Sequence, residues 1–80
     1  MNEYTHENKG DGAMKVGALL NLFDDWNKYI IINDNSLNRL YNARTKIFEF
    51  MDEKEKHKDL LGKEIVSFGL YDDDFCVRVK

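Results

Sequence analysis

Residues 65–80 have the sequence IVSFGLYDDDFCVRVK, and this stretch decides the fold. Apolar side chains occupy alternate positions on both sides of the acidic turn at 71–74, namely Val66, Phe68 and Leu70 before it and Phe75, Val77 and Val79 after it. A period of two residues is typical of strands, whose successive side chains point to opposite faces. The stretch therefore predicts a β-hairpin whose two apolar rows share one face of a sheet.

Upstream of the hairpin, residues 14–36 change from a helical to a strand pattern. Val16, Leu19, Leu20 and Phe23 have the spacing of an amphipathic helix that begins near Met14. Carboxylates are unfavourable at a helix C-terminus, so we expect this helix to stop near Asp24-Asp25, with Trp26 packing the following turn. Residues 29–32 are aromatic and β-branched and run into the polar segment 33–36, which predicts a strand ending in a turn.

Residues 37–61 are harder to assign. Residues 37–51 can be given helical spacing with Ser36 as N-cap, but a strand over 38–45 followed by a helical turn through Ile47, Phe48 and Phe50 is preferred. Oppositely charged residues three and four apart over 52–58 predict a solvated helix, which Leu60 and Leu61 anchor to the core.

Together these elements have the order α-β-β-α-β-β. This order predicts an α+β domain with an antiparallel four-stranded sheet and helices packed on one face. Residues 1–13 are polar and have no apolar period, so we expect a flexible N-terminal tail before a single domain at 14–80.

The composition limits the classes of protein to which the chain can belong. One cysteine allows no intrachain disulfide and, without an apolar segment of membrane-spanning length, favours the cytoplasm of a bacterial host cell. Twelve basic residues against fifteen acidic ones make direct nucleic-acid binding unlikely from the sequence. A domain of this size has a small core, so self-association into a homodimer is one remaining route to stability.

None of the polar clusters has the pattern of a catalytic, cofactor or metal site. Cys76 is best explained as a small strand residue and His57 as a surface histidine. Asp34, Ser36 and Asn38 imitate the start of an EF-hand loop, but Arg39 and Thr45 stand where glycine and glutamate are needed. We therefore expect no catalytic, cofactor-binding or metal-ligating residues, and no enzymatic activity.

Two surface features remain that suit binding. One is an apolar row on the sheet face opposite the helices, with Tyr29 and Ile31 or Ile30 and Ile32, together with Ile65, Tyr71 and Tyr41. The other is acid gathered at turns, which suits a basic groove on a partner. The candidate partner-binding residues are Asp34, Tyr71, Asp72, Asp73 and Asp74.

The chain is similar to a loosely defined group of small phage and mobile-element proteins from low-G+C Gram-positive bacteria. The matching stretches are residues 15–23, 29–35, KDLLGKEI at 58–65 and YDDDFCV at 71–77. That group has no established catalytic residues. Some phage proteins of similar size and acidity inhibit host defences, CRISPR nucleases among them.

Two functions follow as hypotheses. The first is a phage-type binding protein that inhibits a host nuclease or another defence component, as an anti-CRISPR or other anti-defence factor, by occluding a binding surface. The alternative is a self-associating module that sequesters a small ligand such as a nucleotide signal, in a pocket lined by Tyr29, Tyr41 or Arg44.

Overall fold

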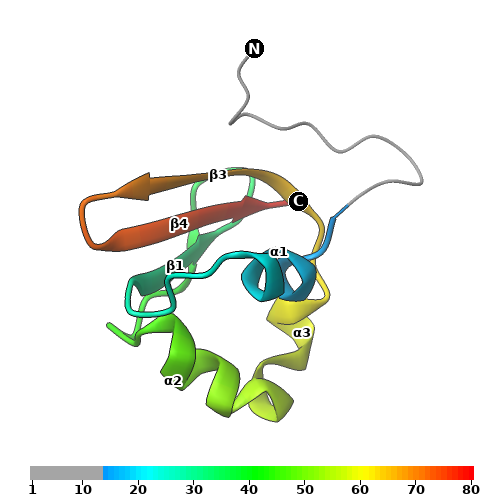
Figure 1. Cartoon of the computed structure of the whole chain (residues 1–80). Helices are drawn as coiled ribbons and strands as arrows, with labels where there is room; N and C mark the ends of the chain where they lie inside the picture. The colour runs from blue at the N-terminus through cyan, green and yellow to red at the C-terminus, as the bar shows by residue number, and fades with distance from the viewer. Residues whose placement is uncertain (1–13) are drawn as a thin grey trace.

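The computed structural model describes residues 14–80 and has two layers, with a four-stranded sheet on one side and helices on the other (Figure 1). Its elements are, in chain order, α1 (Val16–Leu22), β1 (Tyr29–Asn33), β2 (Arg39–Tyr41), α2 (Ile47–Asp52), the 3₁₀ helix η2 (Lys54–His57), α3 (Lys58–Leu61), β3 (Ile65–Tyr71) and β4 (Asp74–Val79). The predicted α+β class and the packing of the helices on one face are confirmed. No helix among residues 14–80 has the length and apolar character needed to cross a membrane.

The strand order across the sheet is β2-β1-β4-β3. The pairs β1–β2 and β3–β4 are antiparallel as predicted, but β1 and β4 run parallel in the centre, so the sheet is mixed. The helical segment 47–61 is responsible for this difference, because it carries the chain back along the sheet before β3 begins. A return connection of this kind is what parallel strands require, whereas a hairpin suffices for antiparallel ones.

The core lies between the layers. It is built from the apolar side chains of the predicted helical stripe and of the predicted alternating strand pattern. Helix α1 contributes Val16, Leu19 and Leu20, all buried, and the rings of Phe23 and Phe75 stack at 4.2 Å across the two layers. Helix α1 ends at Leu22, where Trp26 Nε1 donates a hydrogen bond of 2.8 Å to the Leu20 carbonyl. Carbonyls in the last turn of a helix lack intrahelical partners, so this bond stabilises the C-terminal end of α1, just before the acidic residues 24–25.

The segment 37–61 contains the predicted strand and the predicted helix, both shorter than expected. Strand β2 covers only three residues, since Leu37 and Arg44 on its two sides have left-handed backbone conformations. The helical part is divided at Glu53, whose φ of −112° and ψ of 35° end α2 before η2 begins. Two of the expected ion pairs form on this surface, Lys56–Glu53 at 3.6 Å and Lys58–Glu55 at 3.0 Å.

Irregularities in the strand register move two residues away from the face predicted for them. A register shift between Ile65 and Ser67 turns Ile65 toward the helices, where it is 2% exposed. A second shift lies between Ile32 and Asn33, and Ile32 pairs with Tyr41. Tyr41 packs on the ring of Phe50, with the ring centroids 4.9 Å apart. Ile65 and Tyr41 therefore belong to the helix side, and their predicted place on the opposite face is wrong because a bulge reverses the alternation.

Candidate functional site: the open face of the sheet

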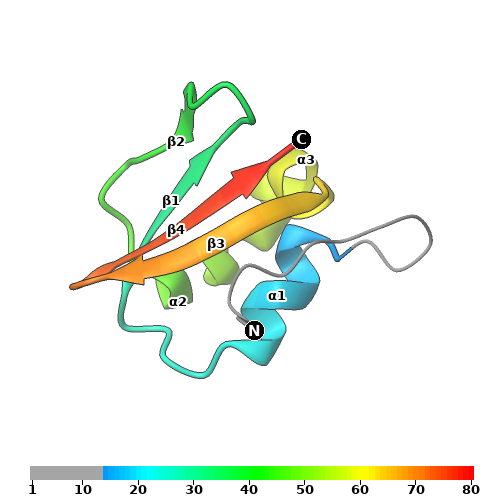
Figure 2. The ribbon, with the colours of Figure 1, turned by 90° about the horizontal axis from the view of Figure 1, so that it is seen from above.

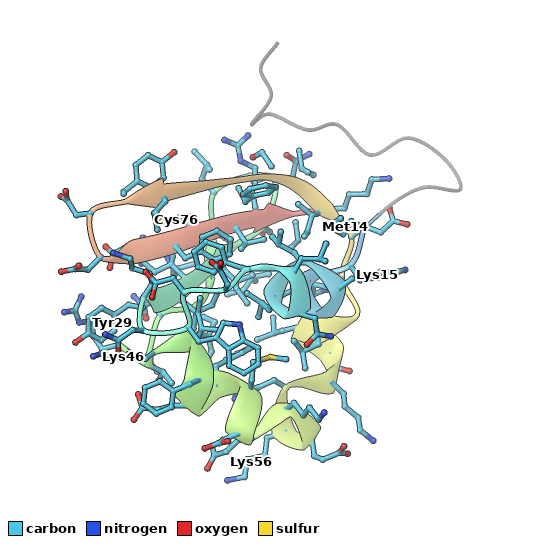
Figure 3. The ribbon with its side chains drawn as sticks, viewed as in Figure 1. Met14, Lys15, Tyr29, Lys46, Lys56 and Cys76 are labelled. Atoms are coloured by element: carbon cyan, nitrogen blue, oxygen red, sulfur yellow. The ribbon has the colours of Figure 1, made fainter. Side chains whose placement is uncertain are left out.

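The face of the sheet that points away from the helices is not covered by any element of residues 14–80 (Figure 2). We call it the open face. Its side chains form three rows that cross the strands, because the register aligns them: Arg39, Asn33, Arg78 and Ser67 in the cationic row; Ile31, Cys76 and Gly69 in the middle row; and Tyr29, Asp74 and Tyr71 in the aromatic row. Cys76 marks this face in Figure 3.

The cationic row brings together two arginines from strands that are distant in the sequence. Arg39 Nε donates a hydrogen bond of 2.7 Å to Asn33 Oδ1, which leaves its terminal amino groups available. Arg78 lies on the other side of Asn33 and is exposed, with no ion pair to any residue of 14–80. The strands carrying the two arginines are separated by one strand, so the Cα atoms are roughly 10 Å apart.

The aromatic row carries two tyrosines in different settings. The Arg44 guanidinium lies 4.1 Å from the centre of the Tyr29 ring, with Lys46 Nζ at 5.6 Å, and Figure 3 shows Tyr29 beside Lys46 at one end of the sheet. The Tyr71 ring lies across Gly69, where a Cβ would come within 2.8 Å of the phenol oxygen. Tyr71 is nevertheless 64% exposed, so its ring rests on the sheet with one side toward solvent.

The open face has two hollows, one mainly over β3 and β4 and the other mainly over β1 and β2, and each is lined by residues of all three rows. A hollow of about 230 Å³ is lined by Asn33, Leu37, Ser67, Phe68, Gly69, Tyr71, Cys76, Val77 and Arg78. A second, of about 330 Å³, is lined by Tyr29, Ile30, Ile31, Arg39, Asn42, Arg44 and Asp74. The small side chains at positions 69 and 76 leave room for the first of these hollows.

The thiol of Cys76 in the middle row is not activated as a nucleophile. Burial, followed by the charge of Asp74, raises its pKa above the ordinary value, and the charge of Arg39 lowers it by less. A reactive cysteine needs the opposite balance, with a lowered pKa and a base in reach. Arg39 itself borders the middle row, since it lines one hollow together with Ile31.

Three residues with left-handed backbone conformations border the open face. They are Leu37, Arg44 and Asp72, with φ of 68°, 52° and 54°. Among residues 14–80, no other non-glycine residue has a positive φ. Aspartate tolerates the conformation, but leucine and arginine do so at a cost of about 1–2 kcal/mol. Strained backbone of this kind concentrates at functional sites. Here it brings Leu37 to one hollow and Arg44 to the other.

The predicted acidic turn of the β3–β4 hairpin is exposed but partly neutralised by basic residues. Lys28 Nζ lies 3.7 Å from an Asp73 carboxylate oxygen and 3.2 Å from the Asp72 carbonyl, and Arg44 lies 3.9 Å from Asp74. Asp74 belongs to the aromatic row, whereas Asp72 and Asp73 form the tip. The turn and Tyr71 are therefore adjacent, as their sequence positions require, and they flank the open face at its hairpin end.

Asp34, the other predicted site residue, organises the turn between β1 and β2. Its carboxylate accepts hydrogen bonds from the Asn38 amide nitrogen at 2.8 Å, from Asn38 Nδ2 at 3.1 Å and from the Ser36 amide nitrogen at 2.9 Å. These bonds, with those of Asn38 foremost, hold the pKa of Asp34 below its ordinary value. Asp34 does not lie with the hairpin turn. Its effect on the site is indirect, because the turn it closes presents Leu37 to the open face.

The remaining candidates lie on the helix side. The His57 ring stacks on the buried ring of Phe50 at 4.1 Å and meets Tyr41 at 5.3 Å, so it is half-buried rather than a freely solvated surface residue. Of the residues proposed for a nucleotide pocket, Tyr29 and Arg44 meet beside the open face. Tyr41 lies on the helix side, where it lines a hollow of about 440 Å³ together with Arg44 and His57. No group of three or more metal-ligating side chains comes together within residues 14–80.

The arginines of the open face are the site residues that sequence reasoning missed. Alternation alone places Arg78 on the same face as Cys76, but the pairing of β1 with β4 is needed to bring Arg39 into one row with Arg78. Comparison with known proteins adds no further identification: no protein-family model matches the chain, no curated protein matches it, and no solved structure matches it.

Proposed function

We propose that this protein is a non-enzymatic binding protein, of the kind carried by phages and mobile elements, that inhibits or modulates a host macromolecule by covering one of its surfaces. The observation that carries the proposal is the open face, which spans four strands and is bordered by Leu37 and Arg44 in strained conformations. A domain in which strain surrounds an uncovered face is organised for contact with a partner rather than for stability alone.

The electrostatics of the open face favour an anionic surface on that partner. All three arginines of the chain, Arg39, Arg44 and Arg78, lie on or beside this face, and Asp74 is the single carboxylate in its rows. The acidic turn is less suited to enter a basic groove than its sequence suggests, since Lys28 already engages Asp73 at the tip and Arg44 engages the adjacent Asp74. Complementary charge sets the choice and the rate of association of partners more than their affinity.

The chemistry at Cys76 supports binding rather than catalysis. The open face offers one thiol whose pKa is raised, together with arginine, asparagine, serine and tyrosine side chains that donate hydrogen bonds. Such a set can recognise and orient an anion, while nucleophilic catalysis asks for an activated group paired with a base.

Arg78→Glu tests the proposal in a capture experiment on bacterial lysate. We expect wild-type protein to retain a macromolecule that Arg78→Glu loses, because the substitution reverses the charge of an exposed residue of the cationic row that has no ion pair within residues 14–80. Lys56→Glu is the matched control, with the same change in net charge on the helix side of the molecule (Figure 3). Equal recovery by wild type, Arg78→Glu and Lys56→Glu would contradict the proposal.

A ligand-sequestering module remains the second candidate because Tyr29 and Arg44 meet beside the hollow of about 330 Å³. Native mass spectrometry of the freshly purified protein distinguishes the two. An oligomer carrying a few hundred daltons of additional mass favours the sequestering module, and a ligand-free protein favours the binding protein.

A further inference from the structure

We infer that the open face binds single-stranded nucleic acid, with phosphates at the cationic row and bases at the aromatic row. This inference rests on the proposed function, since it names the anionic macromolecule that the face would cover. The juxtaposition that carries it is Arg39 and Arg78 in one row and the flat, exposed Tyr71 ring in another, on the same side of one sheet.

The cationic row has the chemistry of a phosphate-binding strip. Arg78 has no ion pair within residues 14–80, and Arg39 is bonded through Nε alone, so both present free planar donors. Arginine recognises phosphate through parallel N–H donors with better geometry than lysine. Ser67, which pairs with Arg78 across the strands, adds a hydroxyl donor at the same level.

The aromatic row supplies a platform for a planar ring. Gly69 allows the Tyr71 ring to lie on the sheet, because any Cβ at that position would meet the ring's Cε2 and Cζ at 3.0 Å. The outer side of the ring faces solvent. Stacking on an aromatic side chain is tolerant of base identity and is combined with a basic track in proteins that bind single strands.

The spacing of the rows agrees with a nucleotide lying along the strands. Each row is two positions along the strand from the next. The cationic and aromatic rows are therefore four positions apart, which is roughly 13 Å at Cα level. The Tyr71 ring leans over Gly69 and the arginine side chains extend from their own row, so both reach into this interval. A base over the middle row or Tyr71 can therefore have its phosphate at Arg78.

The shape of the face favours a strand over an enclosed small ligand or a duplex. The hollows, of about 230 and 330 Å³, lie at or below the lower end of the range of about 300–1,000 Å³ for small-molecule sites, and both belong to one exposed surface. A duplex is recognised by an element that enters a groove, and the open face carries none. An acidic protein segment would use the arginines but leave the exposed Tyr71 ring without a planar partner.

The net charge of −3 argues from the sequence against direct nucleic-acid binding. The inference departs from that expectation because the register gathers Arg39 and Arg78 on one face, but the overall charge still makes the expected binding weak and sensitive to salt. The acidic residues elsewhere on the molecule repel a polyanion, so we expect a Kd on the order of 10⁻⁵ M. Affinity therefore depends on a small number of contacts at the face, and removal of one has a measurable effect.

Fluorescence anisotropy with a fluorescein-labelled 15-nucleotide single-stranded DNA of mixed sequence tests the inference on the full chain at low and moderate salt. We expect Arg78→Gln to weaken binding roughly tenfold at 50 mM salt and to reduce the slope of log K against log salt by about 0.7. Tyr71→Ala is expected to weaken binding about tenfold with the slope unchanged. Gly69→Ala, which displaces the ring but keeps it, is expected to weaken binding in the same direction, and Lys56→Gln is expected to bind as wild type.

Three results would overturn the inference: no binding of the labelled strand at 50 mM salt, equal loss with Lys56→Gln and Arg78→Gln, or equal competition by a polyglutamate peptide of the same length. The last result means that the face recognises negative charge alone. Nuclease treatment of the lysate in the capture experiment separates the two proposals. Face-dependent capture that survives the nuclease, without binding of the DNA strand, leaves the proposed function standing and excludes nucleic acid as the partner.

Discussion

At the scale of single residues, Asp34 and Leu37 have different roles in the turn between β1 and β2: Asp34 holds the turn together and Leu37 is exposed on it. Asp34 accepts three hydrogen bonds within the turn, and Leu37 adopts a φ of 68° while its side chain is 64% exposed. The Asp34 carboxylate thus holds the turn, and the turn exposes the apolar side chain of Leu37 to solvent, which is unfavourable for an apolar group. Each residue makes a prediction that can be tested alone.

Asp34→Asn is expected to reduce the loss of stability in acid. The folded-state pKa of Asp34 lies below its ordinary value of 3.8, so its contribution to stability is complete above about pH 5 and is lost as the pH falls through the lowered pKa. Asparagine can still accept from the amide nitrogens of Ser36 and Asn38 but does not titrate. Thermal melts from pH 6 to pH 2.5 measure the difference.

The control for that experiment is Asp59→Asn, which removes a surface carboxylate of α3 that has no ion pair or hydrogen bond to another side chain within residues 14–80. A pH profile of Asp34→Asn as steep as that of wild type and of Asp59→Asn would show that the turn does not respond to protonation of Asp34.

Leu37→Gly is expected to stabilise the fold by about 0.5–1 kcal/mol and to weaken binding at the open face. Glycine adopts positive φ without the steric cost that leucine meets, and little buried area is lost from an exposed side chain. Leu37→Ala is the matched variant, since it also shortens the side chain but keeps the Cβ that causes the strain. Urea denaturation checks the order of stability, and a Leu37→Gly protein no more stable than Leu37→Ala contradicts the explanation.

At the scale of elements, helix α1 and the β3–β4 hairpin are the parts that their own periodicity determines. The stripe of residues 16, 19 and 20 is buried as predicted, and the two apolar rows of the hairpin pair on one face from Phe68 to Phe75. The short strand β2 and the divided helix 47–61 were ambiguous for a physical reason. Their boundaries depend on the local conformations of Leu37, Arg44 and Glu53, which no periodicity encodes.

Gly17→Ala tests the packing between α1 and α3. A Cβ at Gly17 would meet the Leu61 carbonyl oxygen at 3.5 Å and its Cβ at 3.6 Å, which are ordinary contacts. Alanine has the higher helix propensity, so we expect the free energy of unfolding to rise by about 0.5–1 kcal/mol. Circular dichroism during urea denaturation measures the change, and Gly62→Ala just beyond α3 provides a comparison outside a helix interior. A destabilised Gly17→Ala protein would show that the two helices are closer than described.

At the scale of the whole molecule, the sequence predicts the α+β class and the two layers, but the composition of the open face depends on long-range register. Arg39 and Arg78 become neighbours only because Asn33 pairs with both. Bulges at the ends of β1 and β3 then decide that Ile65 and Tyr41 face the helices. Neither pairing nor bulge has a signal in a single sequence, so the predicted apolar face is found to be largely cationic and aromatic.

The parallel pairing of β1 with β4 also has a kinetic consequence. Its partners are separated by about 45 residues, and β4 is the strand that joins β1 to β3. A ribosome synthesising the chain must release residues 74–79 before the middle of the sheet can form. Until then Ile30 and Ile32 lack the strand that completes their surroundings. The loop-closure entropy of this long-range contact is therefore expected to limit the rate of folding.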